Sequence, residues 1–131
     1  MSENYCKVKG DTILVKDFRK MEYVNEDDIR LLELIIDKID WEAKDPFHMT
    51  LQMMELCDLL NVGLDAPHRA MAALEHLFGV AFFEVREPSG NVHGGMLVPN
   101  WNWNKEYTEV YLHLNADLLG AMFKLWSLRT A

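Results

Sequence analysis

The sequence is poor in cysteine and proline and contains no long hydrophobic run. Its two cysteines, Cys6 and Cys57, form no CxxC pair, so two free, reduced thiols are expected rather than a disulfide. No apolar stretch approaches the roughly 18 residues that would cross a bilayer, and the first residues lack the apolar core of a signal peptide. These absences predict a cytoplasmic protein that does not associate with a membrane.

The sequence also lacks the motifs that usually carry catalysis or bind a metal. There is no GxSxG motif and no phosphate-binding glycine loop, and Gly94-Gly95 is better explained by a bulge or a bend in a hairpin. The histidines show none of the HExxH, HxH or Cys–His spacings of zinc sites; they are His48, His68, His76, His93 and His113. We therefore predict no catalytic residues, no metal site and no cofactor, so the protein is not expected to be an enzyme.

Positive charge is scarce, and the formal net charge is −8. Residues 22–65 carry twelve acidic side chains against three basic ones, whereas residues 1–21 have a net charge of +2 and residues 66–131 of −1. Broad, nonspecific nucleic-acid binding needs many lysines and arginines that neutralise phosphates. Any contact with DNA is therefore expected from outside the acidic segment, or from another protein.

Three helices are predicted in the first two thirds of the chain, over residues 25–40, 51–62 and 66–79. Asn25 can cap the first helix, whose acidic first turn suits the helix dipole. Thr50 can cap the second helix. Asp65, followed by Pro67, can cap the third, and Gly79 is placed to end it. Two consecutive helices joined by a short glycine-containing turn are the layout of a helix-turn-helix.

After residue 79 the hydrophobic period changes from helical to alternating. Three strands are predicted as a meander over residues 80–87, 94–103 and 107–115, and a closing helix, capped by Asn115, over 115–128. In the last strand one face would hold Tyr107, Glu109, Tyr111 and His113.

A helix-turn-helix followed by a hairpin is a winged helix. We therefore predict an α+β fold in which residues 21–131 form one winged-helix domain. It would contain a three-stranded antiparallel sheet and a closing C-terminal helix. Residues 1–20 would form a basic arm, or a short strand around residues 12–15.

The candidate recognition helix spans residues 66–78 and exposes few basic groups. The candidate DNA contacts are Arg69, His68 and His76 on this helix, Arg86 beside the wing, and Lys16, Arg19 and Lys20 in the N-terminal arm. Arg69 is about as well explained as a solvated charge. The basic arm could equally neutralise the neighbouring acidic helix.

Trp101 and Trp103 lie two residues apart, so they would share one face of a strand. Pro99 cannot donate a hydrogen bond to a neighbouring strand, which places this segment at a sheet edge or a bulge. Two interpretations stay open. Both rings could cover the core, or they could form a dimer interface together with Tyr107 and Tyr111, since tryptophan is enriched at interface hot spots.

The chain resembles the N-terminal winged-helix domain of iteron-binding plasmid replication initiators over roughly residues 20–126. The resemblance runs through the helix pair and is most specific at residues 98–125, where an aromatic strand and a turn lead into an alternating strand. The helix that follows opens with Asn115, Leu118 and Leu119. In this family the first of two winged helices dimerises through its sheet region, contacts the DNA backbone weakly, and switches between repressor dimer and initiator monomer.

The resemblance therefore implies a homodimer with weak or backbone-type DNA contact and a host replication protein, or another protein, as a partner. Two alternatives remain. The chain could be a small phage or mobile-element interaction protein, of the inhibitor or DNA-mimic type, that does not bind DNA. It could also be a winged-helix transcription repressor.

Overall fold

The structure is a computed structural model of the 131-residue chain, and it describes residues 5–7, 14–16, 18, 21–86 and 89–118. The elements in chain order are β1 (Tyr5–Lys7), β2 (Leu14–Lys16), α1 (Glu26–Lys38), β3 (His48–Gln52), α2 (Met53–Leu60), α3 (Pro67–Val80), β4 (Phe82–Arg86), β5 (Val92–Met96), β6 (Asn100–Trp103) and β7 (Glu109–His113). The fold is α+β, as predicted.

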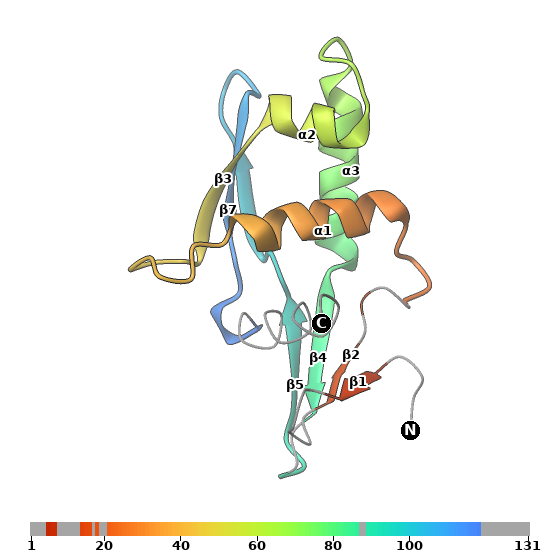
Figure 1. Cartoon of the computed structure of the whole chain (residues 1–131), viewed down its shortest axis with the longest axis vertical. Coiled ribbons are helices and arrows are strands. Elements are labelled where there is room, and N and C mark those ends of the chain that lie inside the picture. The colour runs from red at the N-terminus through yellow and green to blue at the C-terminus, as the bar shows by residue number, and fades with distance from the viewer. Residues whose placement is uncertain (1–4, 8–13, 17, 19–20, 87–88, 119–131) are drawn as a thin grey trace.

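The strands form two separate antiparallel sheets. Sheet A has the order β1-β2-β4-β5, and sheet B has the order β3-β7-β6. In Figure 1, sheet B lies beside α1 and α2, whereas the β4–β5 hairpin extends away from the helices toward the opposite end of the molecule. The predicted strand near residues 12–15 corresponds to β2, which pairs with β4 and so joins the N-terminal segment to sheet A.

Helix α1 begins as the sequence predicts. Asn25 is the N-cap, and its side chain accepts a hydrogen bond from the Asp28 backbone N–H at 2.9 Å. The Asp28 carboxylate accepts from the Asn25 backbone N–H at 3.0 Å, which completes a capping box. Of the acidic residues in the first turn, Asp28 therefore has a structural role, as part of the helix cap.

The helix-turn-helix forms from α2 and α3, but three predicted boundaries are wrong. Thr50 does not cap α2, because β3 extends through residue 52 before the helix begins. The N-cap of α3 is Ala66 rather than Asp65, and α3 continues past Gly79 to Val80. At α2 the pairing of β3 with β7 through Gln52 decides where the helix begins.

The predicted meander is also wrong as a single sheet. The expected strand over residues 94–103 divides into β5, which pairs with β4, and β6, which pairs with β7. Between them Leu97 and Val98 are both buried, which a regularly alternating strand with one solvent face does not allow. The third strand of sheet B is instead β3, which pairs with β7 over its whole length.

Gly94 and Gly95 form neither the bulge nor the hairpin bend expected from the sequence, since both lie within β5 in continuous register with β4. A Cβ atom at Gly94 would lie 2.9 Å from the Phe83 carbonyl oxygen and 3.0 Å from the end of the Phe82 ring. The glycine therefore permits a close approach of two strands.

The core lies between the helices and the inner faces of the strands. Phe18 stacks on Phe83, with ring centroids 5.5 Å apart. The largest fully buried side chains are Phe18, Phe78, Phe83, Leu31, Ile35, Leu51, Leu56, Leu74, Leu77, Leu97, Leu112 and Leu114. Together they tie α1, α3 and both sheets into one hydrophobic cluster.

The closing helix begins where the sequence predicts. The Asn115 side chain accepts a hydrogen bond from the Asp117 backbone N–H at 3.1 Å, as an N-cap does. Leu118 is buried against the core. Residues 119–131, which hold the rest of the predicted helix, lie outside the described residues.

Candidate functional site

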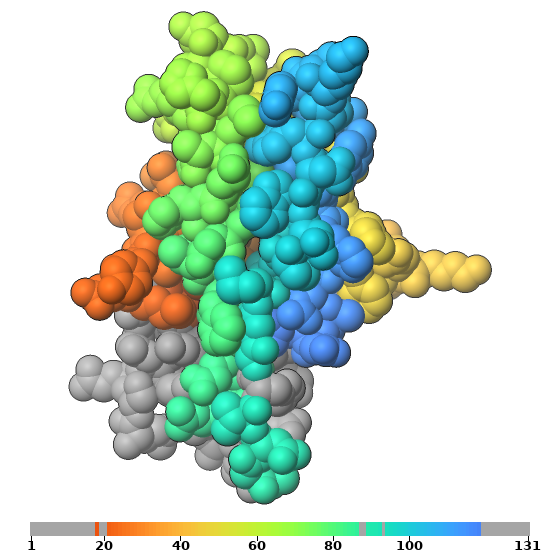
Figure 2. Space-filling model, turned by 180° about the vertical axis from the view of Figure 1, so that it is seen from behind, coloured from red at the N-terminus to blue at the C-terminus, as the bar shows by residue number. Residues whose placement is uncertain are grey.

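The exposed face of α3 carries the predicted DNA contacts of the helix-turn-helix. His68 and Arg69 are exposed in its first turn, where recognition helices meet base edges. Figure 2 shows this helix, in green, running along the surface beside the β6 segment. This face therefore offers one permanent cation to a DNA backbone.

His76, the third candidate on α3, is held by α1. Its Nδ1 atom lies 2.9 Å from the Asp28 Oδ1 atom, and Asp28 is only 1% exposed. The same carboxylate closes the capping box of α1 through its other oxygen. His76 thus links the two helices, although its ring remains partly exposed.

The remaining DNA candidates do not gather beside α3. Arg86 ends β4 and lies 3.6 Å from Glu84. Figure 1 shows β4 continuing from the end of α3. A 14-residue helix and a five-residue strand in the same direction span about 35 Å, so Arg86 lies far from Arg69 at the start of α3. Lys16 lies on β2, and Arg19 and Lys20 lie outside the described residues.

Strand β6 is an edge strand, as Pro99 predicts, because within the described residues it pairs only with β7. Trp101 and Trp103 share one face and lie opposite the buried Leu112 and Val110. That face is the inner one, on which both rings lie toward the core. Trp101 contacts Phe78, with ring centroids 4.6 Å apart, and keeps 40% of its surface exposed.

The opposite face of sheet B, here called the outer face, is open to solvent in the described part of the chain. Its exposed side chains are His48, Thr50, Gln52, Asn100, Asn102, Tyr111 and His113, and the partly buried Glu109 lies on the same face. A hollow of about 380 Å³ lies on it between β3, β7 and β6. Of the four aromatic residues predicted for a dimer interface, Tyr111 is therefore the one on this face.

Tyr107 lies outside β7, contrary to the prediction that it shares a strand face with Tyr111. It has a φ of +56° in the β6–β7 turn, and 52% of its surface is exposed. Asn104 builds this turn, since its side-chain oxygen accepts from the Thr108 and Glu109 backbone N–H groups at 2.8 and 3.0 Å. The side-chain carbonyl therefore fixes a backbone shape that tyrosine seldom adopts.

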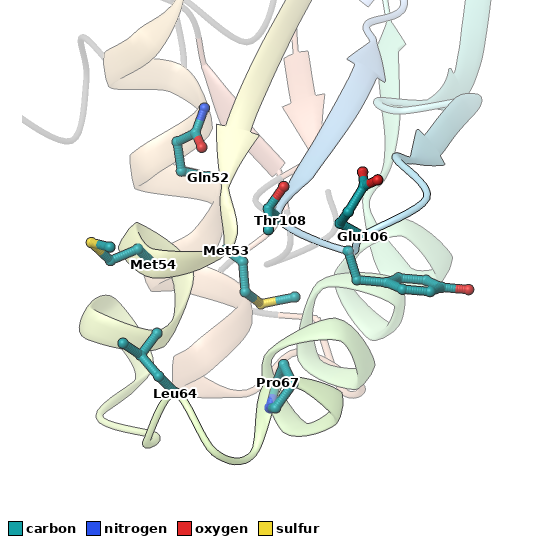
Figure 3. A pocket seen from close by; sticks show the side chains of 8 residues that line it. Gln52, Met53, Met54, Leu64, Pro67, Glu106 and Thr108 are labelled. Carbon is teal, nitrogen blue, oxygen red and sulfur yellow. The ribbon is translucent and has the colours of Figure 1, made fainter.

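A second hollow, of about 340 Å³, opens between the start of α2, the α2–α3 turn and the β6–β7 turn. Figure 3 shows Met53, Met54, Leu64 and Pro67 around it. Its charged lining residue is Glu106. It has an apolar character and offers no pair of groups suited to acid–base chemistry.

The groups that could take part in chemistry are few in the described residues. Cys57 is buried on α2, and burial raises the pKa of its thiol, which disfavours the reactive thiolate. No group of three or more histidine, cysteine, aspartate or glutamate side chains is arranged to hold a metal ion, within the described ranges. Nor is any described helix long and apolar enough to cross a membrane.

Sequence reasoning missed one polar cluster on the outer face. His48 and His113 lie directly opposite each other on β3 and β7, with ring centroids 4.3 Å apart. The His48 Nδ1 atom lies 2.7 Å from Asp45 Oδ2, and this hydrogen bond is the main cause of the lowered pKa of Asp45. The signal that could have found it is the alternation of residues 48–52, which marks a strand.

The helix-turn-helix, the β4–β5 wing and the three-stranded antiparallel sheet B define a winged-helix domain. No protein-family model matches the sequence, and no curated protein matches it. The structure is similar to that of the WH1 domain of MSBI1.176, a replication protein isolated from a multiple sclerosis patient. The TM-score is 0.54 at 17% sequence identity, covering 77% of this chain and 82% of that chain. At this identity the likeness establishes the fold, and the predicted resemblance to a replication-initiator winged helix is confirmed at that level.

Proposed function

We propose that the protein is a dimerisation and regulatory winged-helix domain of a plasmid or mobile-element replication initiator, with weak, backbone-type contact to DNA. The observation that carries this proposal is the outer face of sheet B, next to the edge strand β6, in a domain with the WH1 fold. An edge strand presents unpaired backbone groups that a second chain can use.

The composition of the outer face supports a contact between copies. It presents Tyr111, 41% exposed, among asparagine, threonine and glutamine side chains rather than a row of like charges. Tyrosine is enriched at interfaces, where its ring supplies contact area and its hydroxyl a hydrogen bond. Two identical acidic molecules repel each other least where the contact surface itself holds few acids.

Light scattering at increasing protein concentration tests the dimer. We expect a dimer for the wild type and a shift toward monomer for Tyr111→Ala, because this substitution removes the aromatic side chain from the outer face. Tyr23→Ala is the matched control, since Tyr23 is 74% exposed and precedes α1. A wild type that stays monomeric at every concentration would overturn the proposal, and circular dichroism checks that each variant is folded.

The DNA contact is proposed to be weak because the exposed face of α3 supplies Arg69 and little other positive charge. Fluorescence anisotropy with a labelled duplex should detect binding only at low salt, and Arg69→Ala should weaken it further. Binding that persists at high salt and survives Arg69→Ala would refute this placement of the contact.

A second candidate function is that of an interaction protein that does not bind DNA. The acidic segment favours it, since residues 22–65 carry a net charge of −9 and α1 exposes Glu26, Asp27 and Asp37. A monomer that binds no duplex even at low salt would favour this alternative over the initiator domain.

A further inference from the structure

We propose that His48 and His113 together bind a divalent transition-metal ion on the outer face of sheet B. The two residues lie far apart in the sequence, so their spacing predicts no metal site. The antiparallel register of β3 and β7 places them directly opposite each other. This inference does not depend on any contact with DNA.

The geometry of the pair suits chelation by two imidazoles. Directly opposed residues in an antiparallel pair have Cβ atoms about 4.5–5.5 Å apart, so both side chains rise from the same place on the same face. The ring centroids are 4.3 Å apart, and the planes are inclined at 49°. Two rings at this separation, inclined rather than stacked flat, can direct one nitrogen each toward a shared ion.

Asp45 gives the pair a second feature of metal sites. A histidine that binds a metal through one ring nitrogen almost always donates the other N–H to a carboxylate, a carbonyl or water. The His48 Nδ1 atom lies 2.7 Å from Asp45 Oδ2, which leaves Nε2 as the nitrogen with a lone pair for an ion. The carboxylate thus fixes the tautomer of His48 and makes its Nε2 atom a better electron-pair donor to a metal ion.

The surface around the pair has room for an ion and its water. The hollow of about 380 Å³ is lined by His48, Asn100, Trp101, Asn102, Tyr111, Leu112 and His113. Two protein nitrogens leave the other coordination positions to water. Imidazole suits zinc, copper and nickel ions, whereas magnesium and calcium prefer oxygen ligands.

Isothermal titration of the tag-free protein with nickel chloride tests the proposal. We expect saturable binding that His48→Ala and His113→Ala each weaken by about tenfold or more. Both residues are exposed, so the variants should fold. His68→Ala is the matched control, because His68 is an exposed histidine on α3 with no place in the pair, and its affinity should equal that of the wild type. Magnesium chloride should give no binding.

The Asp45→Asn variant tests whether the Asp45 carboxylate contributes to metal binding by orienting His48. We expect it to weaken nickel binding about tenfold while both imidazoles remain, and to leave the folded structure intact. In NMR spectra, copper ions should broaden the imidazole signals of His48 and His113 before those of the other histidines. Nickel affinity that is unchanged in the His48→Ala, His113→Ala double variant, or no binding by the wild type, would overturn the proposal.

Discussion

Asp28 is an acidic residue and yet buried, and it is the one acidic or basic residue found buried in the described part of the chain. One carboxylate oxygen accepts from the Asn25 backbone N–H, and the other lies 2.9 Å from His76 Nδ1. A single side chain therefore both starts α1 and ties it to α3. Its role is structural, in joining the two helices, and a surface acid of the same helix does not have this role.

We expect Asp28→Ala to lower the free energy of unfolding by about 1–3 kcal/mol, because it removes the capping box and leaves polar groups without partners. Urea denaturation measures the change. Asp27→Ala is the control, since Asp27 is exposed on the same turn and pairs with Arg30 only at 4.0 Å, so its cost should stay near about 0.5 kcal/mol. Equal losses for both variants would refute the structural role of Asp28.

The pKa of Asp45 is lowered from its ordinary value of 3.8. The hydrogen bond from His48 has the largest effect, and the charge of His113 has the smallest. A depressed pKa means that the interaction stabilises the fold above pH 3.8 and is lost as the pH falls through the lowered value. We expect His48→Ala to raise the pKa of Asp45 toward 3.8 and His113→Ala to raise it less. Carboxyl-detected NMR titration measures both, and the opposite order would contradict this assignment.

At the scale of the elements, the β6–β7 turn is held in an unusual shape. Tyr107 and Tyr111 are similarly exposed, but Tyr107 has a φ of +56° and Tyr111 lies in the middle of β7. Glycine adopts a positive φ at no steric cost, whereas in a strand interior it destabilises. Substitution by glycine at each of these two tyrosines therefore compares a position of positive φ with a position inside a strand.

We expect Tyr107→Gly to leave the free energy of unfolding unchanged or to raise it slightly, and Tyr111→Gly to lower it by about 1 kcal/mol. Thermal unfolding of both variants measures the difference. If Tyr107→Gly is the more destabilising substitution, then its ring contributes more packing than its exposure indicates, and the strain argument fails.

The helix caps and strand edges show what the sequence can predict. Asn25 and Asn115 act on amides within three residues, so local pattern suffices to place both helix starts. Residues 48–52 were expected to lead into a helix. They form a strand instead because they pair with β7, about sixty residues later, and no local pattern indicates that pairing. The break between β5 and β6 has the same cause, since it depends on which strand each half of residues 94–103 pairs with.

The features of the candidate site also fall into those that a local signal predicts and those that depend on long-range packing. The edge position of β6 follows from Pro99, a local signal. The pairs His76–Asp28 and His48–His113 depend on helix packing and strand register, which no spacing in the sequence encodes. The same holds for the residues opposite Trp101 and Trp103, since the strand register places Leu112 and Val110 there.

For the whole molecule, the net charge of −8 should make stability depend on salt. Like charges repel in the compact state, and the Debye length falls from about 30 Å at 0.01 M to about 3 Å at 1 M ionic strength. We expect the urea midpoint to rise with sodium chloride. The Asp37→Lys, Glu42→Lys double variant changes the net charge to −4 and should reduce this dependence, since both residues are exposed. An unchanged salt dependence would show that repulsion is not its cause.

Leu97 lies where the chain passes from sheet A to sheet B. Its N–H donates to the Ala81 carbonyl at 2.8 Å, and its carbonyl accepts from the Asn115 N–H at 2.7 Å. A residue between the two sheets is therefore hydrogen-bonded both to the residue that precedes β4 and to a residue that follows β7, and this link connects the two sheets. Amide hydrogen exchange should then give β4 and β7 a common opening free energy, the mark of a single cooperative unit. Separate opening free energies for the two sheets would mean that the link yields before either of them.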